Sequence, residues 1–357
     1  MVRKRLRQYG ITVGNLPTGR ENGITDVTGV RVGHVTLRDE QGVCTGVTAL
    51  IPHSGNLFYE KVPAAVHIIN GFGKTTGLVQ VEELGTIESP ILLTNTFSVP
   101  AVTEGALRYL LKQDPRIGEE AGSINVVVGE CNDSYLNDMR GLHIRPHHAE
   151  EAIQQADSGK VAEGNVGAGT GMVCFGWKGG IGTSSRLIKV GKESFHIGVL
   201  VLANFGKRED FHFLGVPMGR KLESSSIREP DGSIMIIVGT DLPLDAQQLR
   251  RLARRAVFGL ARTGSFAHHG SGDVVIAFSN GNRILVNSAE ATFHSIRRLP
   301  DDGDLLSKCF QAVADATEES IYNALFTAES VIGKEGRKIE ALPVERVIKE
   351  WERNRLL

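Results

Sequence analysis

Cysteine is scarce in this chain of 357 residues, and the few thiols present are isolated from one another. There is no CxxC pair and no zinc-binding spacing, which excludes a disulfide-rich secreted scaffold and a cysteine-based metal site. Scattered thiols of this kind are typical of small buried side chains in a reducing compartment, so we expect a cytoplasmic protein. The four cysteines are Cys44, Cys131, Cys174 and Cys309.

The chain also lacks a long apolar run and an excess of charge of one sign. No stretch reaches the roughly 18 apolar residues that a membrane span needs. The basic opening "MVRKRLRQYGITVG" is not followed by the apolar stretch of a secretory signal. Lys plus Arg number 40 and Asp plus Glu number 41, so no electrostatic attraction to nucleic acid or to an anionic membrane is expected.

Glycine is abundant, with 42 residues, against a usual share of about 7%. The glycines form no repeat and instead punctuate short β-branched segments, which is typical of strands that turn tightly and approach one another closely. Several of these segments are apolar without alternation, as expected for strands covered on both faces. The predicted strands are 30–37, 64–71, 90–95, 123–130, 196–206, 233–241 and 273–280.

Three segments predict helices: 102–113, 245–264 and 304–330. In the second, Asp245 and Gln248 resemble a capping box and Gly264 a C-terminal stop. Residues 207–232 are polar, charged and proline-bearing, and they predict a long exposed loop. Neither a linker nor an internal repeat interrupts the chain, so we expect one α+β domain over residues 1–357.

Several motifs resemble known binding sites but fail on spacing. "NGFGKTTG" lacks the first glycine of a phosphate-binding loop, because Ile68 stands there, and "GAGTGM" is not GxGxxG because it ends in Met172. The tandem histidines at 147–148 and 268–269 stand in no HExxH motif and are typical of solvated loops. We therefore predict neither a metal nor a cofactor.

The stretch "ARTGSFAHHGSGDVVIAFSN" places Ser271 between two glycines at the start of an apolar strand. A simple turn would explain an arbitrary glycine–serine pair. Here the strand offers a rigid platform, and Gly270 leaves its own carbonyl open and permits a strained backbone. Further along, "DATEES" supplies Thr317 and Glu319, which are two apart and would share a site only at or near a helix end.

Six ordered blocks of this chain resemble the family of L-aminopeptidase/D-amino-acid esterase-amidases and β-peptidyl aminopeptidases. They are "GITDVTGVRVGHVT", "NGFGKTTGL", "GECNDSYLND", "GVLVLANFGKR", "ARTGSFAHHGSGDVVIAFS" and "ATEESIYNAL". The resemblance implies a four-layer αββα sandwich similar to N-terminal-nucleophile hydrolases, with different connectivity. It also implies self-cleavage between Gly270 and Ser271, giving chains of residues 1–270 and 271–357, and a homotetramer.

The resemblance gives these residues roles in catalysis. The freed α-amine of Ser271, with a reference pKa of about 7.7–8.0, would accept the proton of the serine hydroxyl. Asn204 and Tyr135 would lie near the oxyanion, although a strand-ending turn and a buried tyrosine are the simpler interpretations of each. Thr317 would hydrogen-bond the nucleophile, and Glu319 would supply a carboxylate, with its neighbour Glu318 as the alternative.

The leading hypothesis is a self-cleaving serine aminopeptidase acting on short peptides, amides or esters. A self-processing acyltransferase of the glutamate N-acetyltransferase kind, with Thr170 as nucleophile, is the first alternative. A non-catalytic binding protein of the same fold is the second. The sequence does not decide among L-, D- and β-residues as substrates.

Overall fold

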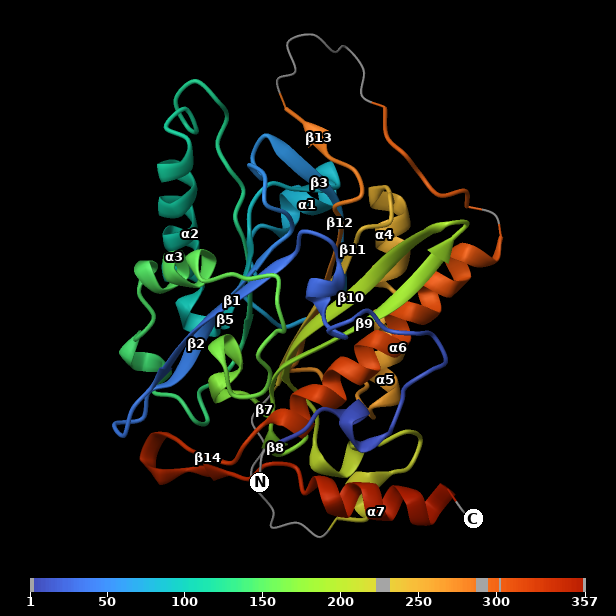
Figure 1. Cartoon of the computed structure of the whole chain (residues 1–357). Helices are drawn as coiled ribbons and strands as arrows, with labels where there is room; N and C mark the ends of the chain where they lie inside the picture. The colour runs from blue at the N-terminus through green and yellow to red at the C-terminus, as the bar shows by residue number, and fades with distance from the viewer. Residues whose placement is uncertain (1–2, 223–231, 287–294, 302, 356–357) are drawn as a thin grey trace.

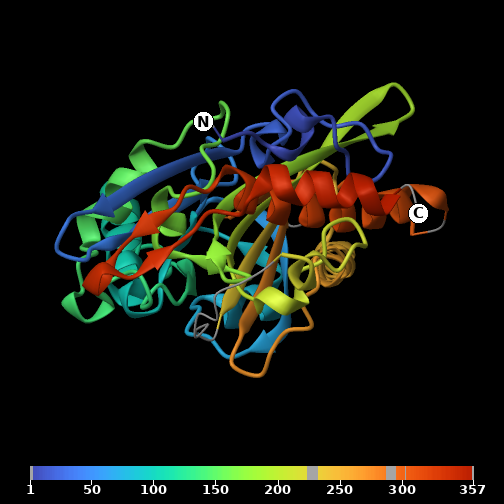
Figure 2. The same ribbon diagram turned by 90° about the horizontal axis from the view of Figure 1, so that it is seen from below.

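The computed structural model describes residues 3–222, 232–286, 295–301 and 303–355. Two β-sheets lie face to face, and helices cover the outer face of each, so the order of the layers is α, β, β, α (Figure 1). Seen from below, the green and teal helices lie on one side of the sheets and the orange helices on the other (Figure 2). The α+β sandwich expected from the resemblance is confirmed.

The first sheet has the strand order β1-β2-β5-β6, antiparallel except for the parallel pair β5–β6. Helices α2 and α3 cover its outer face, where Val102, Ala106 and Ala149 pack against the strands. The elements of this half are β1 (Arg31–Arg38), β2 (Cys44–Ile51), β5 (Ile91–Asn95), β6 (Val127–Cys131), α2 (Val99–Gln113) and α3 (Pro146–Gln154).

The second sheet has the order β13-β3-β12-β11-β10-β9, with β4 paired to β3. Only β11 and β12 run parallel among its pairs in the described residues. Helices α4, α5 and α6 cover its outer face. The bounds are β3 (Glu60–Gly71), β4 (Thr86–Ile87), β9 (Gly180–Val190), β10 (Glu193–Asn204), β11 (Ser233–Thr240), β12 (Gly272–Ser279), β13 (Ile284–Leu285), α4 (Ala246–Ala253), α5 (Ala256–Arg262) and α6 (Asp304–Thr327).

Apolar side chains from both sheets fill the space between them. Leu50, Leu93 and Val127 of the first sheet meet Ile237 and Ile276 of the second, and all are buried. Strands covered on both faces carry continuous apolar runs, which explains why β11 and β12 do not alternate in sequence.

Smaller elements complete the chain. They are α1 (Leu78–Leu84), α7 (Val344–Arg355), the two-stranded ribbons β7 (Val173–Cys174) with β8 (Trp177–Lys178) and β14 (Val331–Ile332) with β15 (Lys338–Ile339), and the 3-10 turns η1 (Leu6–Tyr9), η2 (Ile24–Asp26), η3 (Thr96–Ser98), η4 (Met139–Gly141), η5 (Gly167–Gly171), η6 (Arg208–Asp210), η7 (Met218–Arg220) and η8 (Lys334–Gly336). Within the described residues, no helix combines the length and apolar character needed to cross a membrane.

The helix expected over 245–264 is two helices, α4 and α5, separated at residues 254–255. The predicted N-cap is present, because the Asp245 side chain accepts a hydrogen bond from the backbone N–H of Gln248. The break redirects α5 onto α6, where Gly259 permits close contact. A Cβ on Gly259 would lie 2.4 Å from the carbonyl oxygen of Ala314.

The prediction of a long exposed loop over 207–232 is wrong for residues 207–222, which the structure describes. Phe211, Phe213 and Met218 are buried, and the two phenylalanine rings pack against Tyr322 of α6. The charged residues that flank them, Lys207, Glu209 and Arg220, are exposed and hide this pattern in the sequence. Residues 223–231 lie outside the described residues.

Candidate active site

Four strands of the second sheet end or begin in a single row. Asn204, the last residue of β10, pairs with Ser233 at the start of β11, and Ser233 pairs with Gly272 at the start of β12. Gly272 in turn pairs with Gly71 at the end of β3. Ser271 therefore stands at the edge of a row of strand termini, at the start of a buried strand as predicted.

The turn at the junction of Gly270 and Ser271 is held by several hydrogen bonds. The backbone N–H of Ser271 donates to the carbonyl of His268 at 2.9 Å. Nδ2 of Asn70 donates to the carbonyls of His268 and His269, both at 3.0 Å, and also to the carbonyl of Ser271. Gly270 is partly exposed, while Ser271 is buried.

Backbone strain near the junction sits at Ala267 rather than at Gly270. Ala267 has a φ of 56°, a left-handed conformation that is uncommon for a residue with a Cβ, whereas Gly270 is not among the described residues with positive φ. Gly272, which follows the nucleophile candidate, lies close to the backbone of Phe72. A Cβ there would lie 2.5 Å from the carbonyl oxygen of Phe72.

Oγ of Ser271 donates a hydrogen bond of 2.6 Å to Oδ1 of Asp273. Asp273 is 1% exposed. Burial raises the pKa of Asp273 to about 6, against the opposing effects of the Ser271 hydroxyl and of His268. We did not assign a role to Asp273 from the sequence, although residues i and i+2 of a strand share one face, which is a signal for this pairing.

Asn204 is buried, and both ends of its amide are engaged. Oδ1 accepts a hydrogen bond of 2.8 Å from the backbone N–H of Val173, and Nδ2 donates to the carbonyl of Asn132 at 3.0 Å. Tyr135, three residues beyond Asn132, packs in the small cluster that contains Val173, and Arg337 lies over its ring at 5.5 Å. The two residues implied for the oxyanion are thus joined through one short segment.

Thr317 and Glu319 lie in the interior of α6, far from either helix end, and they point in different directions. Oγ1 of Thr317 donates to the carbonyl of Val313 at 2.8 Å, and its Cβ lies against Gly259 of α5. The two residues were expected to share a site only if they lay at or near a helix end, and they do not lie there.

Glu319 belongs to a buried ion cluster. Its carboxylate contacts Arg7 at 2.7 Å and Arg186 at 2.8 Å. Burial acts to raise the pKa of Glu319, but the two guanidinium groups outweigh it and the pKa is lowered. The side chain of Asn22 donates a further hydrogen bond of 2.6 Å to the same carboxylate. The hydrogen bonds that Ser271 donates go instead to Asp273 and to the carbonyl of His268, so in the described residues Glu319 and Ser271 have separate sets of partners.

The alternative glutamate, Glu318, faces α5. Its carboxylate accepts a hydrogen bond of 3.1 Å from the hydroxyl of Tyr322 and lies 3.3 Å from Arg262. Burial raises the pKa of Glu318, although Arg262 opposes this effect. In the part of the chain that the structure describes, the hydrogen bonds and ion pairs of Glu318 and Glu319 go to residues other than 268–273.

A different carboxylate lies close to the start of β12. Glu130, in β6 of the facing sheet, is buried, and its Oε1 accepts a hydrogen bond of 2.7 Å from the backbone N–H of Lys74. Oε2 accepts a hydrogen bond from Thr96. A Cβ on Gly73 would lie 3.2 Å from Oε1 and 3.8 Å from Cα of Gly272, so only one glycine separates this carboxylate from β12. The sequence reasoning missed Glu130.

Thr170, the nucleophile of the transferase alternative, is enclosed. It is 1% exposed, and its Oγ1 donates a hydrogen bond of 2.6 Å to the carbonyl of Gly167 within η5. Lys178 lies beside this turn with its ammonium directed at three backbone carbonyls. The hydroxyl is thus used within its own turn.

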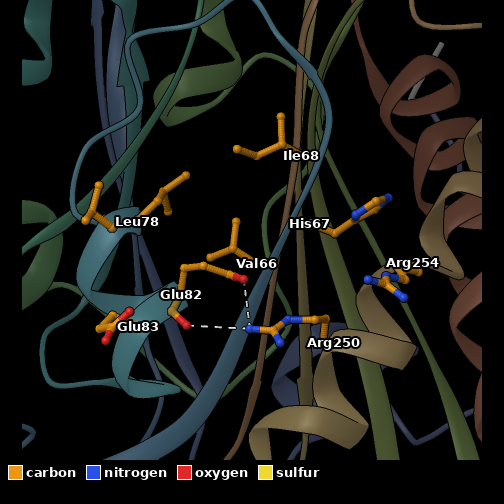
Figure 3. Close-up of a pocket in the computed structure, with 9 residues that line it drawn as sticks. Val66, His67, Ile68, Leu78, Glu82, Glu83, Arg250 and Arg254 are labelled. Carbon is orange, nitrogen blue, oxygen red and sulfur yellow. Dashed lines mark hydrogen bonds and ion pairs between the residues drawn. The ribbon is translucent and has the colours of Figure 1, made fainter.

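A groove of about 760 Å³ opens elsewhere, between α1 and α4, over the edge of β3 (Figure 3). Val66 and Ile68 form part of its floor, and Glu82 pairs with Arg250 across it at 2.8 Å. Its lining has neither a hydroxyl nor a thiol side chain. Among the described residues, no cluster of three or more His, Cys, Asp or Glu side chains is arranged to hold a metal ion.

A model of peptidase family S58 matches residues 22–339 of this chain. The chain is 38% identical to a beta-peptidyl aminopeptidase of Sphingosinicella microcystinivorans, over 98% of this chain and 93% of the relative. It is 36% identical to a beta-peptidyl aminopeptidase of Sphingosinicella xenopeptidilytica, over 96% of this chain and 90% of that relative.

Solved structures agree with these matches. A protein of Pyrococcus horikoshii OT3 superposes with a TM-score of 0.92 at 46% identity, over 98% of this chain and 99% of that one. The L-aminopeptidase D-Ala-esterase/amidase of Ochrobactrum anthropi superposes with a TM-score of 0.91 at 34% identity, with the same coverage. That protein is described as a prototype for the serine aminopeptidases and as a new variant of the Ntn hydrolase fold.

Proposed function

The chain belongs to peptidase family S58, so it is a hydrolase of the aminopeptidase kind, and we propose that it matures by cutting itself between Gly270 and Ser271. The single observation that carries the proposal is the state of Ser271. Its hydroxyl is hydrogen-bonded to a carboxylate at 2.6 Å, and the preceding peptide is held in a turn whose glycine is partly exposed. Cleavage would divide one domain into chains of residues 1–270 and 271–357.

In the matured enzyme, Ser271 would carry a free α-amine beside its own hydroxyl. An α-amine has a reference pKa of about 7.7–8.0, so it is partly neutral near pH 7 and able to take the hydroxyl proton. Attack of Oγ on a substrate carbonyl would form an acyl-enzyme on Ser271 and release the leaving group as an amine or alcohol. Water would then hydrolyse the ester and free the N-terminal residue of the substrate.

The developing oxyanion needs fixed donors, and Asn204 suits that role. Its Oδ1 is occupied by the N–H of Val173, so its Nδ2 donor end is turned away from Val173 and held in place. Tyr135 keeps the role that the resemblance implies, as an oxyanion neighbour. The role that the resemblance implies for Thr317, as a hydroxyl partner of the nucleophile, would require its Oγ1 to leave the carbonyl of Val313.

A carboxylate that binds the substrate ammonium would make the enzyme an exopeptidase. The resemblance implies Glu319 for this carboxylate, with Glu318 as the alternative. The contacts favour Glu130, because its carboxylate is one glycine from β12, whereas Glu319 is neutralised by Arg7 and Arg186. An ammonium lost from a buried carboxylate leaves an unpaired charge, which is costly. Substrates with a blocked amino group should therefore react poorly.

The names of the relatives indicate the substrate class. They act as aminopeptidases on β-peptidyl or L-residues, or as D-Ala esterases and amidases. We infer that this enzyme releases N-terminal residues from short peptides, amides or esters. We also infer a cytoplasmic location, because the cysteines are scattered, buried small side chains, and a homotetrameric assembly, as the resemblance implies.

The test compares free and N-acetylated forms of one alanine or β-alanine amide, using wild-type enzyme and two variants. Ser271→Ala should be inactive on both substrates. Ser265→Ala removes another buried hydroxyl of the same segment and should keep wild-type activity. Wild-type enzyme should turn over the free amine at least 100-fold faster. Equal rates would exclude an aminopeptidase, and an active Ser271→Ala would exclude this nucleophile.

The transferase alternative is less well supported. Thr170 is enclosed and donates within its own turn, whereas Ser271 has a carboxylate partner. A binding protein of the same fold would have no use for a hydrogen-bonded serine at a cleavable turn. A cut before residue 170 would favour the transferase, and an uncut, inactive chain would favour the binding protein.

A further inference from the structure

We propose that Asp273 is the catalytic base of self-cleavage, and that its carboxylate takes the proton of Ser271 Oγ as this oxygen attacks the carbonyl carbon of Gly270. The inference rests on the proposed self-cleavage, and it assigns a function to a residue that the mature reaction leaves without one. Three features carry it: the contact between the two side chains, the absence of an amine in the uncut chain, and the enclosure of the carboxylate.

The contact has the geometry that proton transfer requires. Oγ of Ser271 and Oδ1 of Asp273 are 2.6 Å apart, which is a hydrogen-bond distance between heavy atoms, as proton transfer to a general base requires. Both side chains are nearly fully buried. They lie beside a register shift between β12 and β3. Asp273 pairs with Asn70, but the next residue, Val274, pairs with Ile68. Such irregularities are common where a strand directs a side chain to an active site.

The uncut chain needs a base that the mature enzyme does not. Before cleavage, the nitrogen of Ser271 is a peptide nitrogen whose lone pair is delocalised into the carbonyl of Gly270, so it cannot accept the hydroxyl proton. Its N–H is moreover donated to the carbonyl of His268. The α-amine that serves the mature site therefore appears only after the step that it would have to catalyse.

The reaction balances with Asp273 as the proton carrier. Oγ loses its proton to Asp273 and bonds to the carbonyl carbon of Gly270, giving a tetrahedral oxyanion. The bond from that carbon to the nitrogen of Ser271 then breaks, and the nitrogen takes the proton back from Asp273. The product is an ester between Gly270 and Ser271 with a free amine. Water then hydrolyses this ester, which returns a proton to Oγ and leaves a carboxylate on Gly270.

The surroundings of Asp273 suit a base that works near neutral pH. Burial raises the pKa of Asp273 to about 6, so most of the carboxylate is ionised at pH 7 but remains basic enough to accept a proton. The groups that face it from the packed elements are His268 before the strand, Cys131 of β6, which feels its charge, and the backbone of Ile234 in β11. Oδ2 has no well-formed hydrogen bond among the described residues.

The experiment follows cleavage of the full-length chain after refolding from denaturant, by gel and intact mass, between pH 4.5 and 8.5. Wild-type cleavage should accelerate as the pH rises through about 6 and then level off, because only the ionised carboxylate accepts the proton. Asp273→Asn keeps the shape and the hydrogen-bond acceptor but cannot take the proton. It should cleave at least 100-fold more slowly and lose the rise near pH 6.

Ser233→Ala is the matched control, because it removes a buried hydroxyl of the same row, whose Oγ accepts the N–H of Gly272. It should cleave with the wild-type pH dependence. An Asp273→Asn chain that folds, by circular dichroism, and cleaves within threefold of wild type would overturn the proposal. If that variant does not fold, a flat wild-type profile from pH 5 to 8 overturns it. If Ser271→Ala fails to cleave but Asp273→Asn cleaves normally, self-cleavage by Ser271 stands and Asp273 is not its base.

Discussion

Oδ1 of Asn204 accepts a hydrogen bond of 2.8 Å from the backbone N–H of Val173. Because an N–H can bond only to the oxygen of an amide, this contact fixes which end of the side chain carries the donor. The peptide that supplies the N–H is itself held from its other side, since Nζ of Lys178 donates to the carbonyl of Met172 at 2.9 Å. A buried ammonium thus orients the amide that we assign to the oxyanion.

Replacing Asn204 tests this assignment. Asn204→Ala should lower kcat by about 10²–10³-fold with little change in KM, because the donor is used only when charge develops on the substrate oxygen. Asn204→Asp should be at least as slow, since it places an acceptor opposite the oxyanion. Asn282→Ala, a buried asparagine at the other end of the sheet, serves as the control. Unchanged turnover in Asn204→Ala would remove this residue from the site.

Lys178→Met should impair both stability and turnover. The Lys178 ammonium donates to the carbonyls of Gly169, Met172 and Gly179, and a thioether leaves all three without this donor. The carbonyls of Gly169 and Met172 still accept the backbone N–H groups of Met172 and Gly179, so only the Gly179 carbonyl depends on Lys178. One buried group left unsatisfied costs about 1–3 kcal/mol, and a loss of about that size in unfolding free energy is expected. Lys189→Met, on the exposed part of β9, should change neither. Chemical denaturation and kcat together check the prediction, and a fully stable, fully active Lys178→Met would refute it.

Asp133 gives a stability prediction with a defined sign. Burial raises its pKa from 3.8 to about 7, so the folded chain holds a proton that the unfolded chain releases. Its contribution to stability is present below pH 4 and is lost as the pH rises to about 7. The unfolding free energy of wild type relative to Asp133→Asn should therefore fall between pH 4 and 7 and stay constant above. A difference that rises over that window would contradict the buried, protonated state.

Glu130→Gln and Glu319→Gln identify the carboxylate that binds the substrate ammonium. We expect Glu130→Gln to raise KM for a free-amine substrate and to weaken discrimination against its acetylated form. We expect Glu319→Gln mainly to destabilise the fold, because it weakens the ion pairs of Arg7 and Arg186. The measurement is kcat/KM on both substrates, with thermal melting of each variant. Loss of discrimination in Glu319→Gln alone would restore the role that the resemblance implies.

The sequence predicted the strands that are apolar throughout and the serine at the start of β12. It did not predict β9, because Ser184, Ser185 and Arg186 in its middle are polar, yet all three are buried against partners distant in the chain. Local pattern cannot supply such partners. The same limit applies to Glu319, whose ion pair with Arg7 spans most of the chain. Asp273 was within reach of local reasoning, because strand periodicity alone sets it beside Ser271.

The most direct test of self-cleavage at Ser271 is the intact mass and N-terminal sequence of purified wild-type and Ser271→Ala protein. Wild type should give two chains, residues 1–270 and 271–357, with serine as the first residue of the second. Ser271→Ala should give one chain of full length that melts cooperatively. A Ser271→Ala protein cut at the same bond, or a wild-type enzyme that is active while uncut, would contradict self-cleavage by Ser271.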